Sequence, residues 1–250
     1  NTKGIGVKKF WSLIKYYKTA KEVLEHIQEP FSRDKAERIL KNSNNGILLA
    51  FDQRFPESLK LSEYCPPILY YKGNVNLLQQ SKLAIIGARN ASIAGKSIAN
   101  RLAENLSQQF VITSGMARGI DAIALLGALR NKKVLAVLPF GFDNIYPKEN
   151  LQLFQKIIEQ GLAITEVPFG RTPDQGMFQI RNKLLVSLSR GIVVIEAATK
   201  SGTMTTANMA LDTGCELMVV PGSPLDPRSF GSNLLIKNGE TGQSRLIFLT

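Results

Sequence analysis

The sequence predicts an α/β protein built on an extended Rossmann-type sheet, doubly wound and mostly parallel, behind a small helical domain. From residue 82 onward, short apolar runs alternate with helix-length segments. The runs are continuous rather than alternating, which is typical of strands buried on both faces of a parallel sheet. Composition agrees, because 44% of the 250 residues are hydrophobic and 20% are charged. Such a balance favours a soluble chain with a buried core.

The first 45 residues predict the small helical domain. An apolar stripe at helical spacing predicts the first helix, and two shorter groups predict a second and a third; the stripes are Phe10, Leu13, Ile14 and Tyr17, then Val23, Leu24 and Ile27, then Ala36, Ile39 and Leu40. Residues 46–81 are interrupted by prolines and are expected to form irregular or short extended pieces. They lead into a third region, residues 82–250, which is expected to hold the Rossmann-type domain.

Six apolar runs within residues 82–250 are expected to be its strands: 83–87, 110–115, 133–139, 162–168, 191–197 and 216–222. The segment between the first two carries Ile98, Leu102 and Leu106 at helical spacing and predicts an amphipathic helix. In open α/β sheets, ligands bind in the crevice beyond the carboxyl ends of the strands. The residues that directly follow each run are therefore the candidate binding residues.

The first two of these loops favour an anionic ligand. The loop after the first run lacks the glycines of a dinucleotide fingerprint and carries Arg89, whose guanidinium fork suits a phosphate. The loop after the second run combines glycines, a hydroxyl and an arginine ahead of a helix; these residues are Ser114, Gly115, Arg118 and Gly119. Backbone N–H groups at a helix start bind anions. Asp121 is expected to cap or charge the first turn of that helix.

Two further segments extend the candidate site. The loop after the fifth run again supplies donors around a glycine before a helix, namely Lys200, Ser201, Gly202 and Thr203. The segment between the fourth and fifth runs places basic and polar residues beside an aromatic: Phe178, Arg181, Asn182 and Lys183. Such a cluster suits single-stranded nucleic acid, with phosphate pairing and a base stacked on the ring. The alternative for Phe178 is a place in the core.

The charge balance points to the same class of partner. Lys and Arg total 31 against 20 Asp and Glu, a net charge of +11, which favours a polyanionic partner over a generally basic soluble protein. His26 is the single histidine and lies in the helical segment, so histidine-based catalysis in the crevice is excluded. Glu166 and Glu196 are expected to be structural partners of nearby basic groups. No metal site and no cofactor is expected, and two separate cysteines favour a reducing, cytoplasmic setting.

Several stretches together resemble the DNA-processing protein A family, also called DprA or Smf: IIGARNAS (85–92), SGMARGIDAIA (114–124), FGFDNIYPKEN (140–150), FQIRNKLL (178–185), EAATKSGTMTTA (196–207) and VPGSPLDPRSFGSNLLIKNG (220–239). In addition, GIGVKKFWSLI (4–14) resembles that family's small sterile-alpha-motif-like domain. The resemblance implies the fold predicted above. It also implies single-stranded DNA binding at the candidate residues and help in loading the RecA recombinase during natural transformation, by a cytoplasmic homodimer without enzymatic activity. Lys183 stands where the family usually has a second arginine, which keeps the charge and loses the fork.

The alternative prediction is an enzyme. The segment SGTMTT is similar to part of the nucleotide-hydrolysing phosphoribohydrolases, which share this Rossmann variant and carry the motif GGxGTxxE. Aligning Gly202 and Thr203 with that motif puts Thr206 where the family's catalytic glutamate belongs, which argues against hydrolysis. A protein-binding scaffold, the third reading, fits the basic charge poorly.

Overall fold

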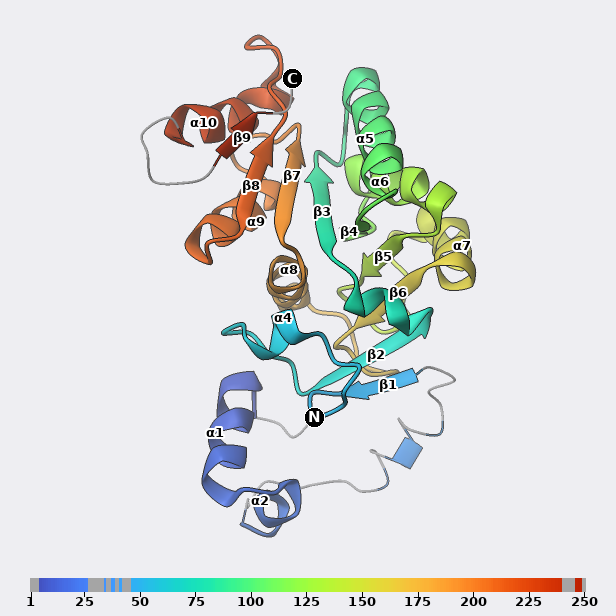
Figure 1. The fold of residues 1–250 in the computed structure, drawn as a ribbon, viewed down its shortest axis with the longest axis vertical. Helices are drawn as coiled ribbons and strands as arrows, with labels where there is room; N and C mark the ends of the chain where they lie inside the picture. The colour runs from blue at the N-terminus through green and yellow to red at the C-terminus, as the bar shows by residue number, and fades with distance from the viewer. Residues whose placement is uncertain are drawn as a thin grey trace.

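The computed structural model describes residues 5–26, 34, 37–38, 41, 46–239 and 246–248 (Figure 1). Its helices are α1 (Val7–Tyr17), α2 (Ala20–His26), α4 (Glu57–Lys60), α5 (Ile93–Leu106), α6 (Ile120–Ala128), α7 (Leu151–Gln160), α8 (Gly176–Leu188), α9 (Gly202–Asp212) and α10 (Phe230–Gly239). Its strands are β1 (Gly46–Leu49), β2 (Ile68–Gly73), β3 (Lys82–Gly87), β4 (Val111–Ser114), β5 (Val134–Val137), β6 (Leu162–Thr165), β7 (Gly191–Ile195), β8 (Glu216–Val219) and β9 (Leu246–Phe248).

The strands of the described chain form one mixed sheet in the order β1-β2-β6-β5-β4-β3-β7-β8-β9. From β6 to β9 all neighbours are parallel, whereas β1 and β2 add to one edge in antiparallel fashion. The predicted α/β fold with a mostly parallel, doubly wound sheet is therefore confirmed. All six predicted strands are present; β3 begins one residue earlier than its apolar run, and the other five are shorter than theirs because backbone pairing stops before the turn residues.

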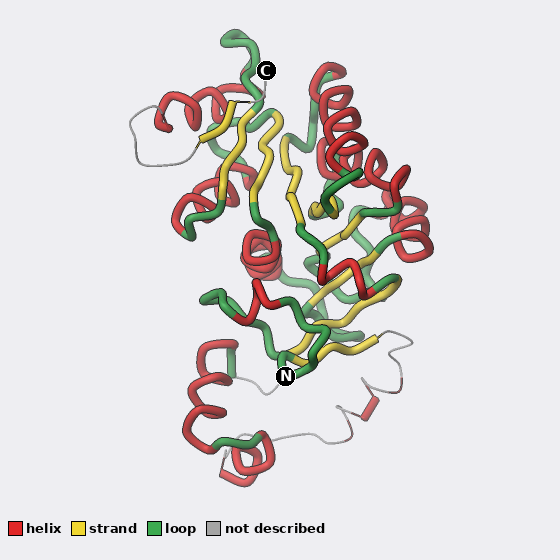
Figure 2. The backbone as a smooth tube through the Cα atoms, viewed as in Figure 1, coloured by secondary structure: helices red, strands yellow, loops and turns green. Residues whose placement is uncertain are grey.

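The two faces of the sheet are covered by different helices (Figures 1 and 2). One face packs against α5, α6 and α7 through a cluster that includes Ile85, Ile112 and Leu125. The other face packs against α8 and α9 through neighbouring residues of the same strands, such as Ile86 and Val194, together with Leu185. Successive strand residues point to opposite faces, so continuous apolar runs are what a sheet covered on both sides requires.

The order of the strands reverses between β3 and β7. The chain winds from β3 through β4 and β5 to β6 in one direction, then returns over α8 to β7 on the other side of β3. Loops at such a reversal diverge and leave a crevice at the carboxyl edge of the sheet. The loop after β3, which borders this crevice, carries Arg89 of the candidate site.

The segment 46–81, predicted to be irregular or briefly extended, contributes β1 and β2 to the sheet. β2 pairs with β6 in the register Tyr70 to Thr165, so the start of β2 lies at the same edge as the end of β6. The predicted first helix is α1, and Val23 and Leu24 of the second lie in α2. Ile27 and the predicted third helix at Ala36, Ile39 and Leu40 lie outside the described residues. Within the part of the chain that is described, no helix is both long and apolar enough to cross a membrane.

Candidate nucleic-acid interface

A pocket of about 320 Å³ opens where β3, β4 and β5 end, and we call it the arginine pocket. It brings together five of the residues predicted from the sequence to bind single-stranded DNA, and none of the residues that line it is acidic. Its lining consists of Arg89, Asn90, Gly115, Ala117, Arg118, Pro139, Tyr146, Pro147, Phe178 and Arg181. Positive charge without a lining carboxylate favours a phosphate ligand.

Arg89 and Phe178 come from opposite sides of the pocket and face each other. Arg89 is exposed in the loop after β3, and its guanidinium carbon lies 5.9 Å from the centroid of the Phe178 ring. Phe178 is half-buried in the first turn of α8 and packs edge-on against Phe140 at 5.2 Å. One edge of this ring belongs to a small core cluster, and the rest lines the pocket. Phe178 therefore has one side packed against the core and another side that lines the pocket, where contact with a ligand stays a prediction.

Arg181 forms the floor of the pocket and is 8% exposed. Its Nη1 donates to the carbonyl oxygens of Gly115 at 2.6 Å and Val137 at 3.3 Å, which joins the ends of β4 and β5. A side chain at Gly115 would collide with this guanidinium, because a Cβ there would lie 1.7 Å from Nη1. Burial lowers the pKa of Arg181 and raises the pKa of the buried Asp121, while the attraction between the two charges opposes both shifts.

The loop that enters α6 supplies Arg118 and Gly119. Arg118 is exposed and its Nε forms an ion pair with Glu149 Oε1 at 2.8 Å. An exposed pair of this kind contributes about 0–1 kcal/mol, so a phosphate can replace the carboxylate at little cost. Gly119 precedes α6 with φ +74°, and a Cβ there would lie 2.2 Å from the carbonyl oxygen of Ala88. The glycine is needed for the close approach of this loop to the loop after β3.

Several predicted site residues lie outside the lining of the pocket: Gly119, described above, and Ser114, Asn182 and Lys183. Ser114 is fully buried at the end of β4, where its hydroxyl donates to the carbonyl of Ile85 at 2.6 Å. It therefore joins β4 to β3, and it presents no hydroxyl to a ligand in this structure. Asn182 accepts a hydrogen bond from Arg181 Nε at 2.9 Å and so orients that guanidinium. Lys183 is exposed on α8 with its Nζ 5.8 Å from the ring of Tyr64.

The loop after β7 also stays outside the lining of the arginine pocket. Ser201 accepts a hydrogen bond from Met204 N and caps α9, and Thr203 donates to the carbonyl of Gly87 at 3.0 Å. The Thr203 hydroxyl thus holds the loop against the end of β3, whereas the Ser201 hydroxyl fixes the start of α9. Lys200 and Gly202 are exposed on it.

Both glutamates predicted to be structural have internal hydrogen-bond partners that are not basic, and each also interacts electrostatically with a basic residue, Lys183 for Glu166 and Arg228 for Glu196. Glu196 accepts hydrogen bonds from the backbone N–H and the hydroxyl of Ser92, which fixes the start of α5. Glu166 accepts from the Tyr64 hydroxyl at 2.7 Å, while its Oε1 is buried without a hydrogen-bond partner among the described residues. Burial raises the pKa of Glu166 to about 7, against the opposing effects of the Tyr64 hydrogen bond and the Lys183 charge.

Sequence reasoning missed one wall of the pocket, which Pro139, Tyr146 and Pro147 form in the long connection after β5. Tyr146 is 52% exposed, and its ring centroid lies 6.2 Å from that of Phe140 and 6.5 Å from that of Phe178. The position after a strand was a usable signal for this wall. The connection lacks the combination of glycine and arginine that marked the other loops as candidates. Within the described residues, no group of His, Cys, Asp and Glu is arranged to hold a metal ion.

Comparison with known proteins identifies relatives that share most of this architecture. The chain is 36% identical over 189 residues to DNA processing protein DprA of Streptococcus pneumoniae, which covers 75% of this chain and 67% of the relative. It is 37% identical over 191 residues to DprA of Bacillus subtilis, covering 75% of this chain and 64% of that one. Against protein Smf of Escherichia coli the identity is 36% over 203 residues, and the chain spans 54% of its length.

Two solved structures agree with the fold over most of the chain. DNA processing protein A from S. pneumoniae superposes with a TM-score of 0.87 at 29% identity, covering 98% of this chain and 90% of the other. The same protein from Helicobacter pylori, described for its single-stranded DNA binding mode, gives a TM-score of 0.73 at 32% identity over 81% and 90% of the two chains. The family described as DNA recombination-mediator protein A matches residues 46–245. The chain therefore belongs to the DNA recombination-mediator protein A family.

Proposed function

We propose that this protein binds single-stranded DNA without sequence preference at the arginine pocket. The observation that carries the proposal is the pairing of Arg89 with Phe178 at 5.9 Å, within a pocket that two further arginines line. A cation next to an aromatic face offers one partner to a phosphate and one to a base, and neither partner depends on which base is present. The relative from H. pylori, which is described as binding single-stranded DNA, supports this choice of ligand.

The proposal extends to the biological role. The family assignment supports a mediator of recombination, and we propose that the DNA-bound protein helps to load the RecA recombinase in natural transformation, as a homodimer in the cytoplasm. Holding and delivering a strand requires no bond cleavage, so we propose binding without catalysis. We retain as direct DNA contacts Arg89, Arg118, Phe178 and Lys183, with Gly115, Gly119, Asn182 and the exposed Lys200 and Gly202 as further candidates. We assign Ser201 and Thr203 to shaping the loop after β7.

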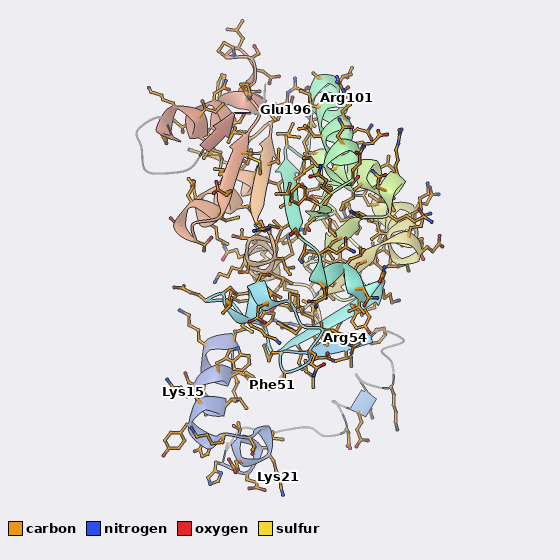
Figure 3. All side chains as sticks on the ribbon, in the orientation of Figure 1. Lys15, Lys21, Phe51, Arg54, Arg101 and Glu196 are labelled. Atoms are coloured by element: carbon orange, nitrogen blue, oxygen red, sulfur yellow. The ribbon has the colours of Figure 1, made fainter. Side chains whose placement is uncertain are left out.

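Arg89→Ala is expected to weaken binding of a labelled oligothymidylate about tenfold, the size of one lost charge-assisted hydrogen bond. The slope of log K against log salt should also flatten by about 0.7, the value for one phosphate of a single strand. Anisotropy titrations over a series of salt concentrations measure both. Arg101→Ala is the matched control, since Arg101 is an exposed arginine on α5 (Figure 3). An Arg89 variant that binds like the wild type at every salt concentration would place the DNA elsewhere.

Phe178→Leu is expected to cost roughly 1–3 kcal/mol of single-strand binding, because leucine fills much of the apolar site and offers no ring for stacking. The salt slope should stay unchanged, since no phosphate contact is lost. Phe230→Leu, at a ring 44% exposed on α10, is the control for loss of an aromatic side chain. Thermal melting separates the two predictions for Phe178. Normal DNA affinity with a lowered melting temperature would assign this ring to the core alone.

A further inference from the structure

A second hollow, of about 610 Å³, lies between α1 and residues 50–65, and we call it the Trp11 groove. Its lining is mixed rather than apolar, with two lysines, one glutamate and an aromatic ring: Val7, Lys8, Trp11, Ser12, Ala50, Lys60, Ser62, Glu63 and Cys65. No contact described for the arginine pocket uses it. Its size and its lysines raise the question of what it holds.

Trp11 anchors α1 to the segment that precedes β2. The indole N–H donates to the carbonyl oxygen of Cys65 at 2.6 Å, and the ring packs edge-on against Phe51 at 5.7 Å. The ring is only partly buried. A positioned, partly exposed aromatic side chain between lysines is a surface on which a nucleobase can stack.

The cations are exposed along both walls. Lys8 projects from α1 and Lys60 from α4, where its Nζ donates to the carbonyl of Asp52 at 3.3 Å. Glu63 is the acidic residue among those that line the groove. Two exposed lysines next to a partly buried indole match the chemistry of a single strand better than that of a neutral peptide.

One lining residue of the groove, Cys65, lies near the edge that carries the arginine pocket. Because β2 starts where β6 ends, the residues that precede β2 lie at the carboxyl edge of the parallel strands. Tyr64 lies in this stretch, directly before Cys65, and Lys183 of α8 lies 5.8 Å from its ring. Along one edge of the sheet, therefore, the loops after β3, β4 and β5 are followed by Lys183, Tyr64 and then the groove.

We propose that a bound single strand runs from the arginine pocket past Lys183 and Tyr64 into the Trp11 groove. There Lys8 and Lys60 contact its phosphates and Trp11 stacks one base. The proposal rests on the proposed function and adds to it a second subsite and a path for the DNA between the two. It also gives the N-terminal helix a share in DNA binding, because α1 forms one wall of the groove.

Oligonucleotides of two lengths distinguish binding at the two subsites. The double variant Lys8→Ala/Lys60→Ala is expected to bind an oligothymidylate of about 30 nucleotides about tenfold more weakly than the wild type, with a salt slope flatter by about 1.4 for two lost phosphates. An oligothymidylate of about 6 nucleotides, near the site size of a single groove, is expected to bind both proteins equally. The control, Lys156→Ala/Lys237→Ala, removes the same charge from α7 and α10, where both lysines are exposed.

Trp11 is the one tryptophan of this sequence, so its fluorescence reports on the groove directly. The long oligonucleotide is expected to quench it in the wild type and not in the Lys8→Ala/Lys60→Ala variant, and the short one is expected to leave it unchanged. The double variant could bind the long oligonucleotide as the wild type does, while Arg89→Ala weakens binding of both oligonucleotides. This result would overturn the proposed role of the groove and leave that of the arginine pocket standing. Equal weakening of both lengths by the double variant also overturns it. Wild-type binding by Arg89→Ala at both lengths would remove the proposed function itself.

Discussion

Arg181→Ala is expected to lower the free energy of unfolding by about 3–5 kcal/mol, the range measured when one partner of a buried charge pair is removed. The reason lies in what the guanidinium holds. It satisfies the carbonyls of Gly115 and Val137 and provides a positive charge near the buried Asp121. Without it, the two carbonyls lose these hydrogen bonds and the buried Asp121 loses the nearby positive charge. Chemical denaturation at neutral pH measures the loss.

A double-variant cycle tests this explanation. Asp121→Asn removes the second buried charge, so the double variant Arg181→Ala/Asp121→Asn should lose less stability than the two single variants combined. Arg181→Lys keeps a charge and loses the planar fork, and it is expected to recover only part of the stability. DNA binding is measured below the melting transition. Wild-type stability of Arg181→Ala together with weakened DNA binding would assign Arg181 to phosphate contact and not to support of the pocket floor.

Glu166→Gln is expected to change the pH dependence of stability. The folded protein keeps the Glu166 proton up to a pKa of about 7, whereas an unperturbed glutamate carboxyl has a pKa of 4.5. Between these values the folded state binds more protons than the unfolded chain, so the wild-type free energy of unfolding falls as pH rises through this window. The whole effect is about 3 kcal/mol, and it should be absent in Glu166→Gln, which carries no charge.

Denaturant titrations from about pH 4 to about pH 8 check this sign. The slope of the free energy of unfolding against pH is proportional to the difference in bound protons between the unfolded and the folded state. The free energy of unfolding of Glu166→Gln, relative to the wild type, should rise steadily across the series. The control is Glu63→Gln, at an exposed position near Tyr64, which should keep the wild-type profile. Parallel wild-type and Glu166→Gln curves would mean that the carboxylate is stabilised by more than Tyr64 and Lys183.

The parallel part of the fold followed from the sequence because its information is local. A strand covered on both faces reads as a continuous apolar run, and all six such runs became strands. β1 and β2 were not predicted to join the sheet, since their pairing depends on β6, a partner far along the chain that no local pattern encodes. The edge they form, with Tyr64 and the Trp11 groove, was therefore not predicted either.

The candidate site, too, was predicted where the signal is local and missed where it depends on strand pairing. Arg89, Arg118 and Phe178 were found because they follow strands or start helices, and the structure brings them to one pocket. Ser114 was expected to face the ligand. Instead, β4 includes this residue, and its hydroxyl donates to the carbonyl oxygen of Ile85. The exact last residue of a strand decides whether a side chain faces the crevice or a neighbouring strand. That boundary depends on inter-strand hydrogen bonds and not on residue type.

The pairing of β2 with β6 also orders events during synthesis. Domains form as the chain emerges from the ribosome with its N-terminus first. β1 and β2 can pair with each other early, but a lone two-stranded hairpin is marginally stable in water. The free edge of β2 finds its partner only after Leu162–Thr165 has been translated. Since α1 docks onto Cys65, just before β2, a helix that is made before the sheet is among the last parts to be completed.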